Sequence, residues 1–219
     1  MISTCICGSF RFWKEMQNIG NDLSKTGITV YMPEPSEFRT LEDLTKFSQG
    51  FFNQERSKRM DEIRERTLKH FEKIDKSDSI YVVAGDECLR KIRFKDRDIA
   101  EVGYVGISTS MEMGYAHGKD KPISLHWKNK PVPLRPAMRE ENNLFYFYNI
   151  DEHISLPLNE ERSVAVQIGY AFAFDKPIYM MESLHDVNEY PIEAVSQGSL
   201  SIEEFLKRIK DGSIKRKEK

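Results

Sequence analysis

Short apolar segments alternate with helical segments along the first 125 residues of the chain. Residues 2–7, 28–32 and 79–84 are apolar and rich in β-branched side chains, and turn-forming residues bound each run, which predicts buried strands. Residues 121–125 predict a fourth strand. A strand–helix alternation is satisfied by a mainly parallel sheet with helices packed on its faces. The sequence therefore predicts an α/β layer architecture.

Helical segments occupy the intervals between these strands. Residues 10–24 follow the first strand, and Gly27 ends that helix. Residues 57–76 carry apolar side chains at spacings of three and four, with charged residues between them. Residues 202–209 predict a last helix with one apolar face. The charged run 86–98 is interpreted as a solvated excursion.

The second half of the chain is expected to belong to the same domain, which spans residues 1–219. Residues 127–160 are interpreted as a proline-containing insertion, and within them residues 144–148 predict an aromatic strand. Residues 212–219 form a basic C-terminal tail, which is typical of a solvated chain end.

Composition limits the classes of partner. Lys and Arg total 33 against 35 Asp and Glu, and a net charge of −2 disfavours binding to nucleic acid polymers. The spacing Cys5-x-Cys7 is not typical of metal sites, so these residues are interpreted as small core residues and no metal is expected. The sequence has no signal-peptide pattern and no apolar run long enough to cross a bilayer. A cytoplasmic protein without membrane contact is expected.

Glu112 stands in the segment 109–114 (TSMEMG), after the glycine-bearing loop 103–106. This position is expected near the start of a short helix, where a partial positive charge and free N–H groups keep a carboxylate ionised. An ionised carboxylate can act as a nucleophile. Thr109-x-x-Glu112 also fits a capping box, in which the glutamate only satisfies backbone donors. Both interpretations are open on this segment alone.

Gly8-Ser9-Phe10-Arg11 stands where the first strand passes into a helix. Glycine allows close backbone approach, serine offers a hydroxyl, and the helix start offers donors to an anion. An ordinary turn with a surface arginine explains the same residues. Glycine-rich motifs for nucleoside triphosphates and dinucleotides are absent, and no cofactor is expected. Because ligands of parallel sheets sit beyond the carboxyl ends of the strands, this turn and the loop before Glu112 are expected to face one crevice.

An internal similarity links two segments of the chain. Residues 108–123 (STSMEMGYAHGKDKPI) and 163–178 (SVAVQIGYAFAFDKPI) match at 8 of 16 positions without a gap. Both predict a helix that runs into a strand, and convergence or partial duplication explains the match. Glu112 corresponds to Gln167 in the second copy. Since Gln cannot carry a negative charge, only the first copy can supply an anionic nucleophile.

Three stretches, in order, resemble the nucleoside 2-deoxyribosyltransferase superfamily, which includes hydrolases of deoxynucleoside 5′-monophosphates. They are residues 7–11 (CGSFR), 73–83 (KIDKSDSIYVV) and 104–116 (YVGISTSMEMGYA). The resemblance covers about residues 2–125, with residues 175–178 (DKPI) as a looser match.

The resemblance implies a Rossmann-like (flavodoxin-like) three-layer sandwich with a mainly parallel sheet, assembled as a homodimer or larger homo-oligomer. It implies that Glu112 is the nucleophile. The other implied site residues are Gly8, Ser9, Phe10 and Arg11 at the sugar or its phosphate, Gly106, Ser108 and Ser110 in the loop lining the same pocket, and Asp78 as a nearby aspartate.

Two positions depart from the family pattern. Many relatives carry an aspartate on the helix before the third strand, where His70 is the nearest match, and some carry a tyrosine where this chain has Cys5. A histidine can protonate a leaving base near neutral pH, and it can equally be a satisfied residue at the core boundary. The acid expected from the sequence is His70 or the nearby Asp78.

The expected activity is cleavage of the N-glycosidic bond of a nucleoside or nucleoside 5′-monophosphate, completed by water or by a second base. The expected partner is therefore a small molecule. A nucleotide-binding or sensing module without turnover, and an NAD-cleaving glycohydrolase, are the alternatives.

Overall fold

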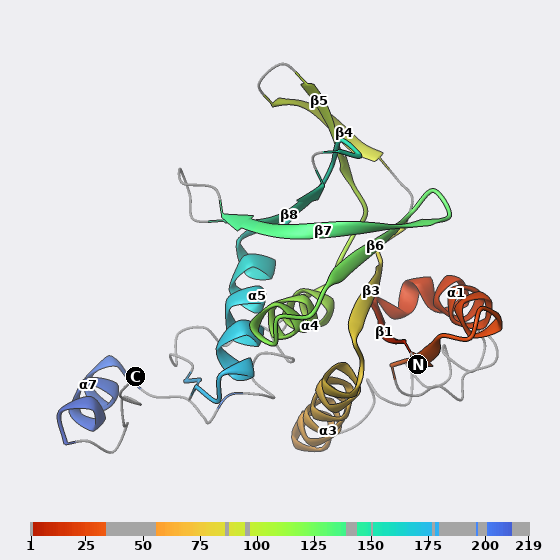
Figure 1. The fold of residues 1–219 in the computed structure, drawn as a ribbon. Coiled ribbons are helices and arrows are strands. Elements are labelled where there is room, and N and C mark those ends of the chain that lie inside the picture. Colours follow the sequence, from red (N-terminus) through yellow and green to blue (C-terminus); the bar gives the residue numbers. More distant parts are fainter. Residues whose placement is uncertain are drawn as a thin grey trace.

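The computed structural model describes residues 2–33, 56–85, 88–94, 97–138, 144–149, 151–176, 178–179, 196 and 201–211. The strands are β1 (Ser3–Gly8), β2 (Thr29–Tyr31), β3 (Ser79–Val83), β4 (Cys88–Phe94), β5 (Arg97–Val102), β6 (Ile123–Trp127), β7 (Lys130–Met138), β8 (Phe145–Asn149) and β9 (Ile154–Pro157). The helices are the 3₁₀ turn η1 (Phe10–Phe12), α1 (Trp13–Lys25), α3 (Arg56–Lys76), α4 (Ile107–Gly118), α5 (Glu160–Ala173) and α7 (Ile202–Lys210). Figure 1 shows their arrangement in space.

A nine-stranded sheet runs through the molecule in the order β2-β1-β3-β6-β7-β8-β9-β5-β4. The first four strands in this order pair in parallel. From β6 onward the pairings are antiparallel, except for the parallel pair of β5 and β9. The predicted α/β fold class, Rossmann-like with a sheet between helices, is confirmed. The parallel part of this mixed sheet contains the strands predicted at residues 2–7, 28–32, 79–84 and 121–125.

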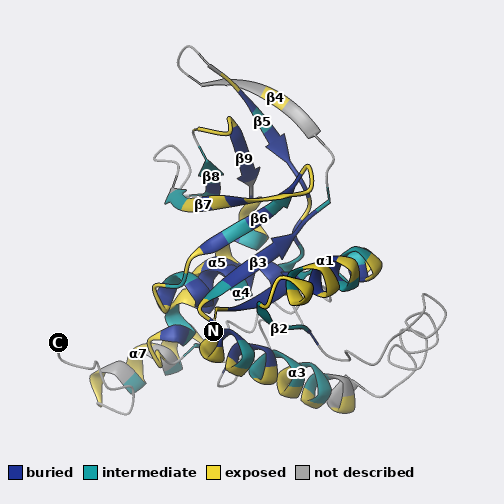
Figure 2. Ribbon diagram, turned by 45° about the vertical axis from the view of Figure 1, so that its right-hand side comes forward, coloured by how far each residue is buried: buried dark blue, intermediate teal, exposed yellow. Residues whose placement is uncertain are grey.

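Alternating side chains on β1 separate the two faces of the sheet. Ile6 packs with Trp13 and Met16 of α1 in one core cluster. Cys5 and Cys7 point to the opposite face and belong to the larger core, which α3 and α4 cover. Successive side chains of a strand point to opposite faces, so one strand serves both cores. Figure 2 shows β3, the neighbour of β1, buried along most of its length.

Part of the charged run 86–98, predicted as a solvated excursion, forms strands. β4 pairs antiparallel with β5, from Cys88 opposite Val102 to Phe94 opposite Arg97. Figure 1 shows this hairpin reaching away from the helices. Lys91 of β4 and Asp98 of β5 are exposed, so these two charges remain solvated within the hairpin.

Residues 127–160, predicted as an insertion with one aromatic strand, extend the sheet by three strands. β8 confirms the aromatic strand, and β7 and β9 pair with it on either side. Lys128 and Asn129 have φ values of 49° and 61° and form the two-residue turn between β6 and β7. A turn with positive φ at both central residues matches the twist of paired antiparallel strands.

α4 and α5, the helices of the two similar segments, pack directly on each other through glycines. A Cβ on Gly114 would overlap the carbonyl oxygen of Val166, and a Cβ on Gly169 would overlap that of Met111. Gly114 corresponds to Gly169 in the sequence match, and Met111 corresponds to Val166. Each helix therefore contacts its counterpart through equivalent positions, as two related copies do across an approximate two-fold axis.

The two helices also end with the same backbone conformation and the same capping hydrogen bond. Asp120 and Asp175 occupy equivalent positions directly beyond the helix ends, with φ values of 54° and 53°. In both copies the N–H of the following lysine returns to a carbonyl of the last helical turn. Such left-handed caps end helices. Ile123 then begins β6. In the second copy the helix is confirmed, Ile178 and Tyr179 are not in a strand, and residues 177 and 180–195, where the predicted strand would continue, lie outside the described residues.

Among the described helices, none combines the length and the apolar character that crossing a bilayer requires.

Candidate active site

Glu112 lies in the second turn of α4, later in the helix than the sequence predicted. The helix begins at Ile107, and Gly106 is its N-cap without a side-chain hydrogen bond. Thr109 is buried inside the helix rather than at its start. The capping-box interpretation is therefore wrong, and the charge of Glu112 depends on its neighbours more than on the helix terminus.

Four side chains from three elements, Glu112 among them, converge at one point. His70 of α3 places its Nε2 atom 3.6 Å from Glu112 Oε1. The same nitrogen lies 3.7 Å from Cys5 Sγ and 3.6 Å from Cys7 Sγ, both on β1. These residues, Cys5, Cys7, His70 and Glu112, are called the β1–α3–α4 cluster below.

The cluster is almost completely closed to solvent. Cys5 and Cys7 are fully buried, and the His70 side chain is 5% exposed. The side chain of Glu112 retains 13% exposure, so it is the member that a ligand could reach from outside. His70 Nδ1 and Glu112 Oε2 are buried, and neither has a hydrogen-bond partner in the described part of the chain. Buried polar atoms in this state are costly, and their presence is typical of functional sites.

Burial and mutual charge change the acidity of the cluster. Burial raises the pKa of the Glu112 carboxyl to about 7, and the positive charge of His70 offsets part of that rise. Burial lowers the pKa of His70, but the negative charges of Glu112 and Cys5 outweigh it and raise that pKa to about 9. A hydrogen bond from Cys7 lowers the pKa of Cys5, whereas burial raises the pKa of Cys7. The cluster thus keeps the imidazole protonated near neutral pH, whereas the Glu112 carboxyl is ionised mainly above about pH 7.

Two arginines, Arg11 and Arg162, lie against Tyr104 at the carboxyl ends of the strands, next to the loop before α4. These three residues, with Ser9, are called the positively charged rim below. Ser9 caps η1 and accepts a hydrogen bond from the N–H of Arg11. The Arg11 guanidinium lies 4.8 Å from the centre of the Tyr104 ring, and the Arg162 guanidinium lies 4.6 Å from it. The N–H of Tyr104 donates to the carbonyl of Ala84, which fixes the loop at the end of β3.

Of the remaining predicted binding residues, Ser108 is open to a ligand, and the others already contact neighbouring residues. Ser108 is exposed at the first turn of α4 and is free to meet a ligand. Ser110 is buried, and its hydroxyl donates to the Gly106 carbonyl within the helix. Gly8 packs against Val83 so closely that a Cβ would come 2.8 Å from the Val83 carbonyl oxygen. The Phe10 ring lies against Trp13, with ring centres 5.6 Å apart.

Asp78 lies apart from the other predicted catalytic residues. It precedes β3 at the amino end of the strand, and its carboxylate accepts hydrogen bonds from the N–H and hydroxyl of Ser3. These bonds lower the pKa of the Asp78 carboxyl. The rim lies at the opposite ends of the same strands, so the structure brings Glu112 and His70 together but not Asp78.

Cys7 and Arg162 are the cluster and rim residues that sequence reasoning missed. The two cysteines are buried as expected for core residues, but their sulfurs also converge on His70. The alternation Cys5-x-Cys7 placed both sulfurs on one strand face, which was the available signal. Arg162 follows the first strand by more than 150 positions and carries no motif of its own.

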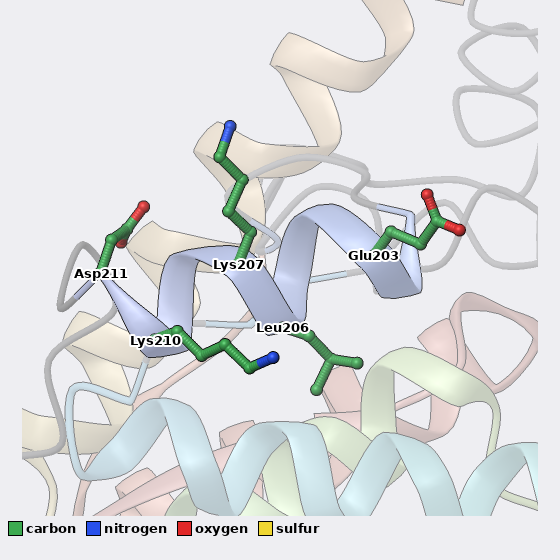
Figure 3. A pocket seen from close by; sticks show the side chains of 5 residues that line it. All are labelled: Glu203, Leu206, Lys207, Lys210 and Asp211. Atoms are coloured by element: carbon green, nitrogen blue, oxygen red, sulfur yellow. The ribbon is translucent and has the colours of Figure 1, made fainter.

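A separate hollow of about 580 Å³ lies on α7 (Figure 3). The side chains that line it come from α7 and the residue that follows it, and Figure 3 labels them: Glu203, Leu206, Lys207, Lys210 and Asp211. None of the predicted site residues lines this hollow, and its charges are solvated lysines and acids. The β1–α3–α4 cluster is therefore the candidate site.

No protein-family model matches this sequence, and comparisons with curated proteins and with solved structures found no significant match.

Proposed function

We propose that this protein cleaves the N-glycosidic bond of a nucleoside or a nucleoside 5′-monophosphate, with Glu112 as the nucleophile. The observation that carries the proposal is the pairing of Glu112 with His70 at 3.6 Å, in a buried site that still exposes 13% of the glutamate side chain. A carboxylate beside a positive group, screened from bulk water, is suited to stabilising and attacking an oxocarbenium-like carbon.

The proposed reaction has two steps. A Glu112 oxygen bonds to the anomeric carbon as the carbon–nitrogen bond breaks, and that electron pair leaves with the base, which gains a proton from His70. The resulting glycosyl ester is then broken by water, which returns a proton to the site and frees the sugar. Attack by a second base in place of water would give transfer. His70 is 95% buried, so it would reach the base only along the face that Glu112 exposes.

The rim supports a 5′-phosphate as part of the preferred substrate. Arg11 and Arg162 both lie within 5 Å of the Tyr104 ring centre, which concentrates two positive charges near the start of α4. Helix starts and arginines bind phosphate through charge-assisted hydrogen bonds. Ser108, exposed on the first turn, offers a hydroxyl to the same group.

Product analysis tests this function. The protein is incubated with nucleosides, their 5′-monophosphates and NAD, and free base is separated by chromatography. Glu112→Gln keeps the shape of the side chain but removes the nucleophile, so base release should disappear. Glu72→Gln, the same change at an exposed site on α3, is the matched control and should retain full activity. Full activity in Glu112→Gln would rule out the assigned nucleophile.

A binding module without turnover is the second candidate. Its support is the chemistry of the cluster, since His70 stands where many members of the resembled superfamily carry aspartate and Cys5 stands where some carry tyrosine. Stabilisation against heat by nucleotides, without release of free base, distinguishes this candidate from the enzyme. Release of nicotinamide from NAD in the same assay would identify the third alternative, an NAD-cleaving glycohydrolase.

A further inference from the structure

We propose that Cys5, Cys7, His70 and Glu112 bind one zinc ion or a chemically similar thiophilic divalent cation. The site itself does not depend on the proposed reaction. The expected effect of the ion on activity does rest on the proposed function, because the ion would bind the carboxylate that serves as the nucleophile.

The donor set is the first support. Zinc in proteins is held by cysteine sulfur, histidine nitrogen and carboxylate oxygen, in four-coordinate tetrahedral sites. β1 supplies two sulfurs, α3 supplies an imidazole and α4 supplies a carboxylate. The donor atoms of Cys5, Cys7 and His70 all lie within 4.8 Å of one another, so one ion can contact all three.

The distances are the second support. At zinc bond lengths of about 2.3 Å to sulfur and 2.1 Å to nitrogen, these two donors lie roughly 3.6 Å apart across a tetrahedral angle. His70 Nε2 lies 3.7 Å from Cys5 Sγ and 3.6 Å from Cys7 Sγ. Glu112 Oε1 lies 3.6 Å from the same nitrogen, well beyond the usual charge-assisted hydrogen-bond length of about 2.8 Å. The donor atoms of Cys5, Cys7 and His70 are thus spaced as one tetrahedral ion requires, and Glu112 approaches the same nitrogen from α4.

Burial is the third support. Glu112 Oε2 is buried, and the described residues offer it no hydrogen-bond partner. A carboxylate oxygen buried without a hydrogen bond is unfavourable, and a divalent ion coordinated at this group would compensate it. The apolar surroundings of the cluster, which include Met111 and Ile80, favour ligands of low hydration such as thiolates.

Cobalt(II) reports directly on such a site, because it replaces zinc and shows strong visible bands in tetrahedral sites and thiolate charge-transfer bands. The reduced, chelator-treated full-length protein is titrated with cobalt and then with zinc. We expect both sets of bands to saturate at one ion per chain and to disappear when zinc is added. Weak bands without thiolate charge transfer at saturation would overturn the site. This measurement uses the wild-type protein and therefore does not depend on the folding of any variant.

Variants then assign the ligands. Cys5→Ser and Cys7→Ser should each lose the tight cobalt complex, whereas Cys88→Ser, which changes the third cysteine on β4, should keep it. Loss of the bands in Cys88→Ser alone would contradict the assignment. Glu112→Gln should weaken binding and retain the thiolate bands.

Activity separates this proposal from the proposed function. If both hold, the metal-free protein releases base and zinc suppresses the release. Base release by a protein that shows no thiolate bands overturns the metal site alone. Metal binding with no base release from any substrate overturns the proposed cleavage alone.

Discussion

His70 Nε2 lies 3.6 Å from Glu112 Oε1, so the two side chains attract each other by charge without sharing a direct hydrogen bond. Both atoms lie between the sheet and the helices α3 and α4, which together bury the site. The imidazole is therefore placed beside a carboxylate that keeps 13% of its side chain exposed.

His70→Gln should reduce the rate of base release by about 10²- to 10⁴-fold, the usual contribution of a general acid. The neutral amide cannot deliver a proton to the leaving base. The rate constant is measured by chromatography at saturating substrate. His117→Gln, on the last turn of α4, is the control and should stay within the error of the wild-type value. An undiminished rate in His70→Gln would require another acid.

Arg162→Gln should raise KM for 5′-monophosphates by about 10- to 100-fold, since a lost charge-assisted hydrogen bond is worth about 1.5–3 kcal/mol. KM for the corresponding nucleosides should not change, because they lack the phosphate. Arg135→Gln, at an exposed position on β7, matches the loss of charge. Equal changes in KM for both substrate classes would place Arg162 outside the phosphate site.

Gly169→Ala should destabilise the protein by about 3 kcal/mol, the upper range for overpacking. A Cβ at this position meets the backbone of Met111, which cannot turn aside as a side chain would. Urea unfolding measures the loss. Gly106→Ala is the matched control, since its nearest contact for a Cβ is the Tyr104 hydroxyl at 4.0 Å. That variant should lose about 1 kcal/mol or less, as expected for an altered N-cap.

Tyr115→Phe should cost about 1 kcal/mol of unfolding free energy. The Tyr115 hydroxyl donates to Asp75 at 2.8 Å, while the ring itself stacks on Phe71 and would remain in place. Tyr170, its counterpart on α5, is 41% exposed, so Tyr170→Phe should be nearly neutral. Similar losses in both variants would show that the bond to Asp75 contributes little.

Asp78→Asn should lower stability at neutral pH and lose this effect in acid. The hydrogen bonds from Ser3 lower the pKa of Asp78 in the folded protein, so the carboxylate contributes stability above its unfolded pKa. That contribution fades as the pH falls through the folded pKa. Denaturant midpoints of both proteins should therefore converge on acidification. Asp61→Asn, at an exposed site on α3, should match the wild type throughout.

The sequence predicted the parallel part of the sheet because its strands are apolar and the helices between them are periodic. The β4–β5 hairpin was missed because charged residues dominate it, and β5 finds its other partner only in β9, more than 50 residues later. β7 was missed because its prolines suggest irregular chain. It pairs with β6 through residues 130–134 and with β8 through residues 135–138, so each half pairs with one neighbour, as an edge strand does, and can accept proline. Pairings of this kind depend on tertiary contacts that local patterns do not contain.

The candidate site was predicted in part. Glu112 and His70 were identified from position, and the structure brings them together. The role of Cys5 and Cys7 could not be predicted, because their spacing shows only that both sulfurs share one strand face. The third and fourth donors come from α3 and α4, and no local signal shows that three elements meet at one point.

The contact between α4 and α5 makes the position of Glu112 depend on the neighbouring helix. Gly114, two residues after Glu112, lies against the backbone of Val166, and Gly169 lies against the backbone of Met111, the residue before Glu112. A larger residue at either glycine would push the two backbones apart and move Glu112 together with its helix. Gln167, the counterpart of Glu112, is exposed, so the two similar helices hold equivalent positions in unlike surroundings.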